Sequence, residues 1–279
     1  MAGSVDELLS RASRREPFVN PDGRSSSAFE RVWIDDEPHV VKYVHLDDDF
    51  TMRVSGDIGC RPVRAWAAGL LDAAPDLVDH AIVGAAFGHG RNGWGAALLM
   101  RDVSAELFAF DEPVIPRDRH DAMLEHLTGL YAATWGWHDD LCGGAPGLLP
   151  YAARWAWFSR AAIDGERSLG WPERVPQIAD EGWRRFRERV TPDLHDLVDA
   201  LRLDATPLAA ALRATPTCLL HGDIKTSNCG TARDGRTVLI DWAYVGEGPA
   251  CHDLAWHLAL DRERLPDTKE GVVDSFRAA

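Results

Sequence analysis

Two short apolar runs, each ending at a cluster of polar side chains, constrain the fold of this chain most. CLL (Cys218–Leu220) leads directly into HGDIKTSN (His221–Asn228), and TVLI (Thr237–Ile240) leads directly into Asp241. Apolar runs of this length between turn residues predict short strands. A loop that follows a strand lies at the surface and commonly carries functional side chains. The pattern therefore predicts a short hairpin with its polar residues gathered at one end.

The polar residues at these strand ends are the types that phosphoryl transfer requires. The reaction needs a carboxylate to orient and deprotonate the attacking hydroxyl, oxygen ligands for Mg²⁺, and cations near the transferring phosphate. Asp223 suits the base, and Lys225 is placed to stabilise the phosphate. Asn228 and Asp241 suit the metal ligands. A lone HGD is a common surface feature, so the interpretation depends on the whole set with its spacing.

HGDIKTSN together with LIDW resembles the aminoglycoside phosphotransferase and choline kinase-like family, which shares the protein-kinase fold. Gly222 stands where protein kinases usually carry Arg, and this points to the small-molecule branch. The resemblance of GPACHDLAW to the family implies that Asp253 braces the catalytic loop by hydrogen bonding. The resemblance is sharp over residues 219–256, looser over 20–105 and faint between them. It implies an α+β, two-lobed fold, with a small antiparallel-sheet N-lobe and a larger, mainly helical C-lobe.

The length and texture of the chain agree with two lobes. A chain of 279 residues is longer than one typical domain of roughly 100–200 residues. The expected parts are a nucleotide-binding N-lobe over residues 1–100, a hinge linker over 101–106 and a helical catalytic C-lobe over 107–279. The closing VVDSFRAA is amphipathic and lacks a helix stop signal, so a C-terminal truncation is one interpretation.

Hydrophobic periodicity predicts the individual elements. In the N-lobe we expect two strands flanking the acidic turn Asp35–Pro38, further strands over 80–88 and 95–103, and helices over 4–15 and 61–72. In the C-lobe we expect helices over 117–135, 150–163, 175–203, 206–213 and 251–260.

Lys42 is the only lysine before Lys225, and it lies in the middle of the apolar run HVVKYV. Two interpretations are open: a lysine that points to solvent at a sheet edge, or the strand lysine that reaches the α- and β-phosphates of ATP. The preceding turn, DGRSSSAF, carries Ser25, Ser26 and Ser27. These residues either hold phosphates through N–H and hydroxyl groups or form an ordinary turn.

The acidic partner of that lysine is missing from its usual place. In the family the strand lysine pairs with an acid on the following helix, but the segment 61–72 begins RPVR and has no acid in its early turns. Three interpretations follow: Asp57 substitutes, Lys42 is held by the nucleotide alone, or the lobe is inactive.

The hinge is predicted from the resemblance alone. The run LLMRDVS ends a strand, and the resemblance implies that backbone groups of Met100, Arg101 and Val103 bond the adenine edge. A plain strand end fits the composition equally well.

Charge and cysteine usage limit the partners and the compartment. With 30 basic and 44 acidic residues the net charge is −14, which disfavours nucleic-acid binding and is compatible with a cationic substrate. The five cysteines form no CxxC, and the chain shows no signal peptide and no apolar run of the ~20 residues that span a membrane. We therefore expect a cytoplasmic protein without a membrane partner.

These observations predict an ATP- and Mg²⁺-dependent phosphotransferase that moves the γ-phosphate to a hydroxyl of a small molecule of aminoglycoside, aminosugar or amino-alcohol type. The alternative is a nucleotide-binding module without turnover, as the missing helix acid suggests. A protein-directed kinase is disfavoured because no DFG or APE follows the catalytic loop. The acceptor and the oligomeric state are not determined by the sequence.

Overall fold

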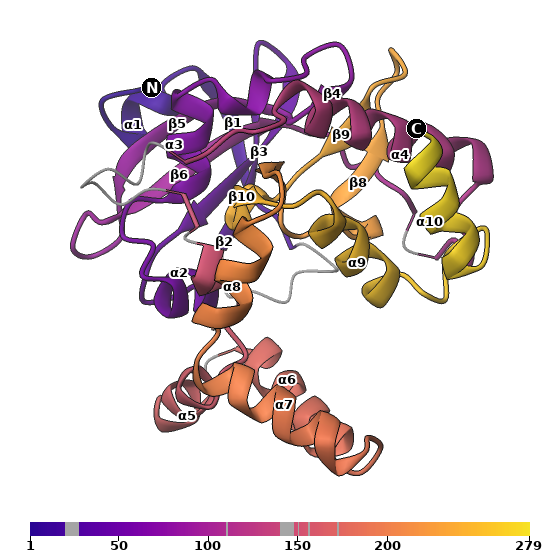
Figure 1. The fold of residues 1–279 in the computed structure, drawn as a ribbon. Helices are drawn as coiled ribbons and strands as arrows, with labels where there is room; N and C mark the ends of the chain where they lie inside the picture. The colour runs from indigo at the N-terminus through magenta and orange to yellow at the C-terminus, as the bar shows by residue number, and fades with distance from the viewer. Residues whose placement is uncertain (20–27, 110, 140–147, 150, 156, 172) are drawn as a thin grey trace.

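The computed structural model describes residues 1–279 except 20–27, 110, 140–147, 150, 156 and 172. The protein has the expected α+β, two-lobed architecture, with an antiparallel sheet in the N-lobe and mainly helices in the C-lobe (Figure 1). The sheet has the strand order β1 (Ala12–Pro17), β2 (Ala28–Ile34), β3 (Glu37–Val44), β6 (Gly95–Arg101) and β5 (Ile82–His89).

The expected acidic turn is a tight hairpin between β2 and β3. Ile34 pairs with Glu37, so Asp35 and Asp36 form the loop, and both have positive φ (53° and 64°). Short polar side chains tolerate this left-handed backbone, which matches the twist of the two strands. Strand β3 then runs between β2 and β6, and Lys42 on it is buried. The interpretation of this lysine as a solvent-facing edge residue is therefore wrong.

The segment 4–15 is not the single helix that its spacing predicts. Helix α1 spans only Val5–Leu8, and Ala12–Pro17 forms the edge strand β1, where Arg15 pairs with Glu30 of β2 at 2.7 Å. One apolar turn does not sustain a helix, because the first hydrogen-bonded turn is costly and tertiary packing supplies most helical stability. Pairing with β2 satisfies the backbone of this polar segment instead.

Helices α2 (Phe50–Ser55) and α3 (Arg61–Ala67) follow β3 in the chain, and α3 covers the first part of the expected 61–72 helix. The C-lobe contains α4 (Arg117–Ala133), α5 (Arg160–Ser168), α6 (Arg174–Arg187), α7 (Pro192–Leu203), α8 (Thr206–Arg213), α9 (Cys251–Leu260) and α10 (Lys269–Ala278). Helices α5, α6 and α7 form a separate group at the bottom of the view in Figure 1.

Two of the expected C-lobe helices are divided. The 150–163 segment is a short 3₁₀ turn, Tyr151–Trp155, followed by α5. The 175–203 segment is split into α6 and α7 because Pro192 opens a new helix and disfavours a helical conformation for Thr191 before it. Periodicity alone did not mark either division.

The two apolar runs that frame the catalytic loop do not pair with each other, which corrects the expected hairpin. Strand β7 (Cys218–Leu220) pairs with β10 (Gly246–Gly248). Strand β9 (Thr237–Leu239) pairs with β8 (Cys229–Thr231) on one side and with β4 (Val78–Asp79) on the other. Because β8 lies directly after the catalytic loop in the chain, it takes the place beside β9 that β7 was expected to fill.

One hydrophobic cluster extends from the N-lobe sheet into the helices of the C-lobe. It runs from Val44 on β3 and Ala85 on β5 through Leu127 on α4 to Val272 on α10. Within the described residues, no helix combines the length and apolar character needed to cross a membrane. The lobe boundaries at residues 100 and 107 stay a prediction.

Candidate active site

The catalytic loop begins where β7 ends, and its backbone requires glycine at one position. Gly222 has φ 85°, in the left-handed region, and a Cβ there would overlap the backbone oxygen of Tyr244 and the guanidinium of Arg154. A side chain at this position is therefore excluded by both conformation and space. This packing explains the HGD pattern physically.

Buried hydrogen bonds hold the first residues of the loop. The Asp253 carboxylate accepts the backbone N–H groups of His221 (3.0 Å) and Gly222 (2.9 Å), as the resemblance implied, and also the hydroxyl of Tyr131 at 3.1 Å. The ring Nε2 of His221 lies 2.9 Å from the carbonyl oxygen of Ile240, at the end of β9. The start of the loop is thus tied to α9 and to the segment that leads into Asp241.

The carboxylate of Asp223 lies at the centre of a converging set of donors. Its Oδ2 accepts from Lys225 Nζ at 2.6 Å and from Asn228 Nδ2 at 2.9 Å. Its Oδ1 accepts from the indole Nε1 of Trp256 at 2.8 Å. The side chain is buried, so these bonds fix its orientation in a region of low dielectric.

Asn228 and Asp241 are neighbours, as a shared metal requires. Strands β8 and β9 pair Cys229 with Leu239, and the N–H of Ile240 donates to the carbonyl oxygen of Asn228 at 3.0 Å. Asp241 follows Ile240 and adopts the left-handed conformation, with φ 64°. Although burial works to raise it, Lys42 and Lys225 hold the pKa of Asp241 at about 2. The site therefore carries an ionised carboxylate beside a side-chain amide.

Lys42 links the N-lobe sheet to this site. Its Nζ donates to Asp241 Oδ1 at 2.8 Å across 199 residues of chain. Burial acts to lower the pKa of Lys42, but the negative charges of Asp241 and Asp49 outweigh burial and raise it. The ammonium is therefore charged and points at the Asp241 carboxylate.

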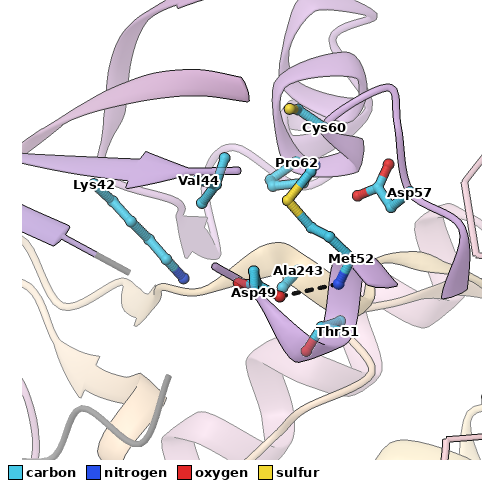
Figure 2. A pocket seen from close by; sticks show the side chains of 9 residues that line it. All are labelled: Lys42, Val44, Asp49, Thr51, Met52, Asp57, Cys60, Pro62 and Ala243. Carbon is cyan, nitrogen blue, oxygen red and sulfur yellow. Dashed lines mark hydrogen bonds between the residues drawn. The ribbon is translucent and has the colours of Figure 1, made fainter. Parts of the chain in front are cut away.

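Asp49 is an acid to which the sequence analysis gave no role in the site. It is the N-cap of α2, where its Oδ1 accepts the backbone N–H of Met52 at 2.9 Å, and it is buried. Figure 2 shows Lys42 from β3 and Asp49 from the start of α2 facing the same small cavity, which Asp57 also lines. An Asp directly before an apolar periodic run is a helix-start signal that would have found α2.

Asp57 has a different partner. Both of its oxygens accept the backbone N–H of Arg61, at 3.0 and 2.9 Å, and the Arg61 guanidinium lies 3.9 Å away. Burial raises the pKa of Asp57, and Arg61 opposes that rise. Asp57 is committed to the first turn of α3, so the acids placed to balance Lys42 are Asp241 and Asp49.

The remaining nucleotide-binding predictions are placed less fully. Ser25, Ser26 and Ser27 lie outside the described residues. Met100 and Arg101 end β6, and the N–H of Arg101 already donates to Ala81 at 2.9 Å. The carbonyl oxygen of Val103 accepts from Glu106 and Leu107, at 2.8 and 3.3 Å. Adenine contacts by this segment stay a prediction.

Trp256 is another residue of the site that the sequence interpretation did not single out. It lies three residues after Asp253 on α9, and residues three apart share a helix face. That spacing, on a helix that already supplies the brace of the loop, was the available signal.

Comparisons with known proteins agree with this geometry. A family model described as "Phosphotransferase enzyme family" matches residues 62–277. Comparison with curated proteins gave no match. Among solved structures, the chain is similar to choline kinase LicA from Streptococcus pneumoniae, at 13% identity and a TM-score of 0.53, over 98% of this chain and 78% of that one.

Two further solved structures share the fold. The aminoglycoside-3'-phosphotransferase of type VIII has 19% identity and a TM-score of 0.50, over 99% of this chain and 90% of that one. The gentamicin-APH(2")-IIa complex has 12% identity and a TM-score of 0.53, over 98% and 80%. The family match spans most of the chain, and the catalytic loop has the residues and the geometry for phosphoryl transfer. This chain belongs to the phosphotransferase enzyme family.

Proposed function

We propose that this phosphotransferase uses Mg²⁺ and ATP to transfer the γ-phosphate to a hydroxyl group of a small molecule of aminoglycoside, aminosugar or amino-alcohol type. The observation that carries the proposal is the convergence of Asp223, Asn228 and Asp241 with two lysines at the end of β9. Phosphoryl transfer is mainly positioning and charge stabilisation, and this set supplies both.

The donor chemistry of the site fits magnesium. Asp241 is ionised, and Asn228 uses its Nδ2 to bond Asp223, so its amide oxygen is the atom suited to a hard cation. Mg²⁺ commonly takes one or two protein ligands and completes its shell with water and phosphate oxygens. When bound there, the ion would neutralise negative charge on the triphosphate.

Asp223 is the proposed general base. Its carboxylate is held by Trp256 on one oxygen and by Asn228 and Lys225 on the other. The role is to orient the acceptor hydroxyl and take its proton as the oxygen attacks the γ-phosphorus. A carboxylate held in advance loses little entropy when the acceptor binds.

The two lysines form ion pairs that the phosphates of ATP are suited to replace. Lys42 pairs with Asp241, and Lys225 pairs with Asp223. An ammonium group binds phosphate oxygens as readily as it binds carboxylate oxygens. We infer that the α- and β-phosphates bind Lys42 in place of Asp241, and that the γ-phosphate binds Lys225 in place of Asp223. Asp223 Oδ2 is then available to the acceptor hydroxyl.

The acceptor class is inferred from charge and from structural likeness. The chain carries a net charge of −14, which is compatible with a cationic substrate. Two similar structures are a choline kinase and a phosphotransferase in complex with gentamicin, and choline and gentamicin both combine cationic nitrogen groups with hydroxyls. A nucleotide-binding module without turnover is less favoured, because the residues proposed as base and metal ligands lie together in the site. We further propose a cytoplasmic location, where the free thiols of Cys60, Cys218 and Cys229 would stay reduced.

The test is turnover of ATP with Mg²⁺ over a panel of aminoglycosides, aminosugars and amino-alcohols. Asp223→Ala should lower kcat by ~10²–10⁴-fold and leave ATP affinity unchanged, because the base acts only in the chemical step. Asp234→Ala is the matched control, since that exposed carboxylate lies in the β8–β9 turn and pairs with Arg236. Full activity in Asp223→Ala would refute the assignment of the base.

A further inference from the structure

Helix α9 contacts the catalytic loop at three points along its length. Near its start, Asp253 accepts the N–H groups of His221 and Gly222. In its middle, Trp256 donates to Asp223. At its C-cap, Asp261 contacts Thr226, three residues beyond the base. The loop is therefore held on both sides of Asp223 by carboxylates from the two ends of one helix.

The contact at Asp261 is buried and fully directional. Its Oδ2 accepts the backbone N–H of Thr226 at 2.9 Å, and its Oδ1 accepts the Thr226 hydroxyl at 2.6 Å. The same hydroxyl accepts from Arg264 Nη1 at 2.6 Å. Asp261 and Thr226 are both buried, at 5% and 3% exposure. A two-point contact of this kind fixes the backbone as well as the side chain of Thr226.

Two histidines continue the contact away from the loop. His257 Nδ1 lies 2.9 Å from Asp261 Oδ2, and a carboxylate accepts, so this nitrogen carries the proton. His257 Nε2 lies 3.1 Å from His120 Nε2, on α4. Burial, with the neighbouring His257, lowers the pKa of His120 to about 4, so this ring is neutral near neutral pH. The contacts thus run in an unbroken series from α4 to Asp261.

The position of Thr226 matters for the two oxygen ligands of the site. Thr226 opens the 3₁₀ turn that ends at Asn228, and the N–H of Asn228 donates to Lys225 at 2.9 Å. Asn228 in turn reaches back to Asp223. Fixing Thr226 therefore fixes the distance between the base and the proposed metal ligand. A displacement of about 1 Å in such a pair is enough to cost about a hundredfold in rate.

We propose that Asp261, backed by His257 and His120, is a positioning residue that sets the geometry between Asp223 and Asn228 during phosphoryl transfer. This proposal rests on the proposed function, because the proposed function assigns Asp223 as the base and Asn228 as a metal ligand. Among the described residues, those that line the cavity beside Lys42 do not include Asp261, so nucleotide affinity should not depend on it. This separation distinguishes positioning from general stability.

The test compares Asp261→Ala, Asp261→Asn and the control Asp199→Asn. Asp199 lies on α7 and pairs with Arg160, Arg187 and Arg202, away from the loop. Asp261→Ala should lower kcat by ~10–100-fold, as for other residues that orient reacting groups, with the KM for ATP unchanged. Asp261→Asn should recover part of kcat, because its amide oxygen still accepts the N–H of Thr226. Asp199→Asn should keep kcat.

Amide hydrogen exchange gives an arm that does not depend on turnover. In Asp261→Ala the amides of residues 224–229 should exchange faster than in wild type, while those around Lys42 stay unchanged. Unchanged exchange in the loop, or faster exchange with an unchanged kcat, would overturn the proposal. If wild type turns over no acceptor on the panel, the proposed function fails, and the exchange arm still decides whether Asp261 holds the loop.

A second pair of variants keeps the question open to experiment if Asp261→Ala does not fold. Thr226→Val removes the hydroxyl that Asp261 and Arg264 share, and Thr226→Ser retains it. Thr226→Val should lower kcat with little change in the KM for ATP, and Thr226→Ser should restore it. Equal kcat values in the two variants would contradict the positioning role.

Discussion

The catalytic loop and the Lys42 pocket are assembled over very different lengths of chain. The loop is braced by Asp253, whose contact with His221 spans 32 residues. Lys42 meets Asp241 across 199 residues, and the cavity beside it combines β3, α2, α3 and Ala243. In both regions a lysine pairs with a carboxylate. The two members of the pair are close in the sequence in the loop and far apart in the sequence at Lys42.

This difference explains why one region is readable in the sequence and the other is not. A loop held by neighbouring elements keeps its spacing, so a short pattern such as HGDIKTSN reports the geometry directly. The second acid that faces Lys42, Asp49, depends on how α2 packs against the C-lobe. Arg53 of α2 bonds Glu166 at 2.8 Å and Glu173 at 3.1 Å, both on the C-lobe. These buried ion pairs hold Asp49 near Lys42, and no local spacing encodes them.

The largest effect is expected at the residue that the two regions share. Asp241→Ala removes both the proposed metal ligand and the partner of Lys42. Turnover should fall by more than about 100-fold, because charge stabilisation at the phosphate is the main source of the rate. The measurement is kcat against Mg²⁺ concentration. An unchanged Mg²⁺ dependence would show that the two regions do not meet at this carboxylate.

The next effect tests whether the loop backbone itself is the constraint. Gly222 and Gly235 both have positive φ (85° and 92°), but a Cβ at Gly235 meets open space whereas one at Gly222 overlaps Tyr244. Gly222→Ala should therefore cost about 1–3 kcal/mol more than Gly235→Ala, which carries the conformational strain alone. Urea unfolding of the two variants gives the difference. Equal losses would mean that the close approach to Tyr244 is unimportant.

A smaller effect distinguishes Asp49 from Asp57, which both line the cavity beside Lys42. Asp49→Asn removes a charge that faces Lys42 and keeps a good N-cap for α2. The KM for ATP should change by up to ~10-fold, as for one charged contact worth about 1.4 kcal/mol. Asp57→Asn should alter stability rather than KM, because Asp57 bonds Arg61. A larger KM change in Asp57→Asn would restore it as the partner of Lys42.

The smallest effect on activity concerns the buried ion pairs that hold α2. Burial, reinforced by Asp49, raises the pKa of Glu173 from its ordinary value of 4.5 to about 7. The folded state therefore binds a proton more tightly than the unfolded state. This stabilisation is complete below about pH 4.5 and is lost as the pH rises through about 7.

Glu173→Gln mimics the protonated side chain at every pH. Relative to wild type, its free energy of unfolding should rise between about pH 4.5 and pH 7 and then level off, by no more than about 3 kcal/mol. Urea unfolding across this range measures the trend. A difference that is constant with pH would show that Glu173 does not titrate there, and kcat should change little in either case.

Several parts of the fold and of the site were predictable because the pattern was local. The β2–β3 hairpin followed from Asp35 and Asp36 between two apolar runs, and β7 and β9 followed from CLL and TVLI. The neighbourhood of Asn228 and Asp241 was also expected, although the pairing of β8, and not β7, with β9 produces it. Each of these depends on contacts between residues close in the chain.

Other parts were not predictable, for identifiable reasons. The polar segment Ala12–Pro17 forms a strand because it pairs with the edge of β2, and the periodicity of its own sequence does not indicate that partner. Strand β7 pairs with β10 rather than with β9. Asp261 and Thr226 are 35 positions apart in the sequence, and their contact depends on how α9 packs against the loop. That both oxygens of Asp261 accept from Thr226 is seen only in the coordinates.

The sequence by itself determined which residue types this protein brings to the site: the proposed carboxylate base, the two proposed oxygen ligands and two lysines, at spacings that fit phosphoryl transfer. The tertiary structure decided which of these charges face one another, that Lys42 is buried on a central strand, and that α9 holds the loop from both sides. The physical reason is that residue types and local spacing fix what a side chain can do. Long-range packing, which folds remote segments together and removes water, fixes the partner it acts on.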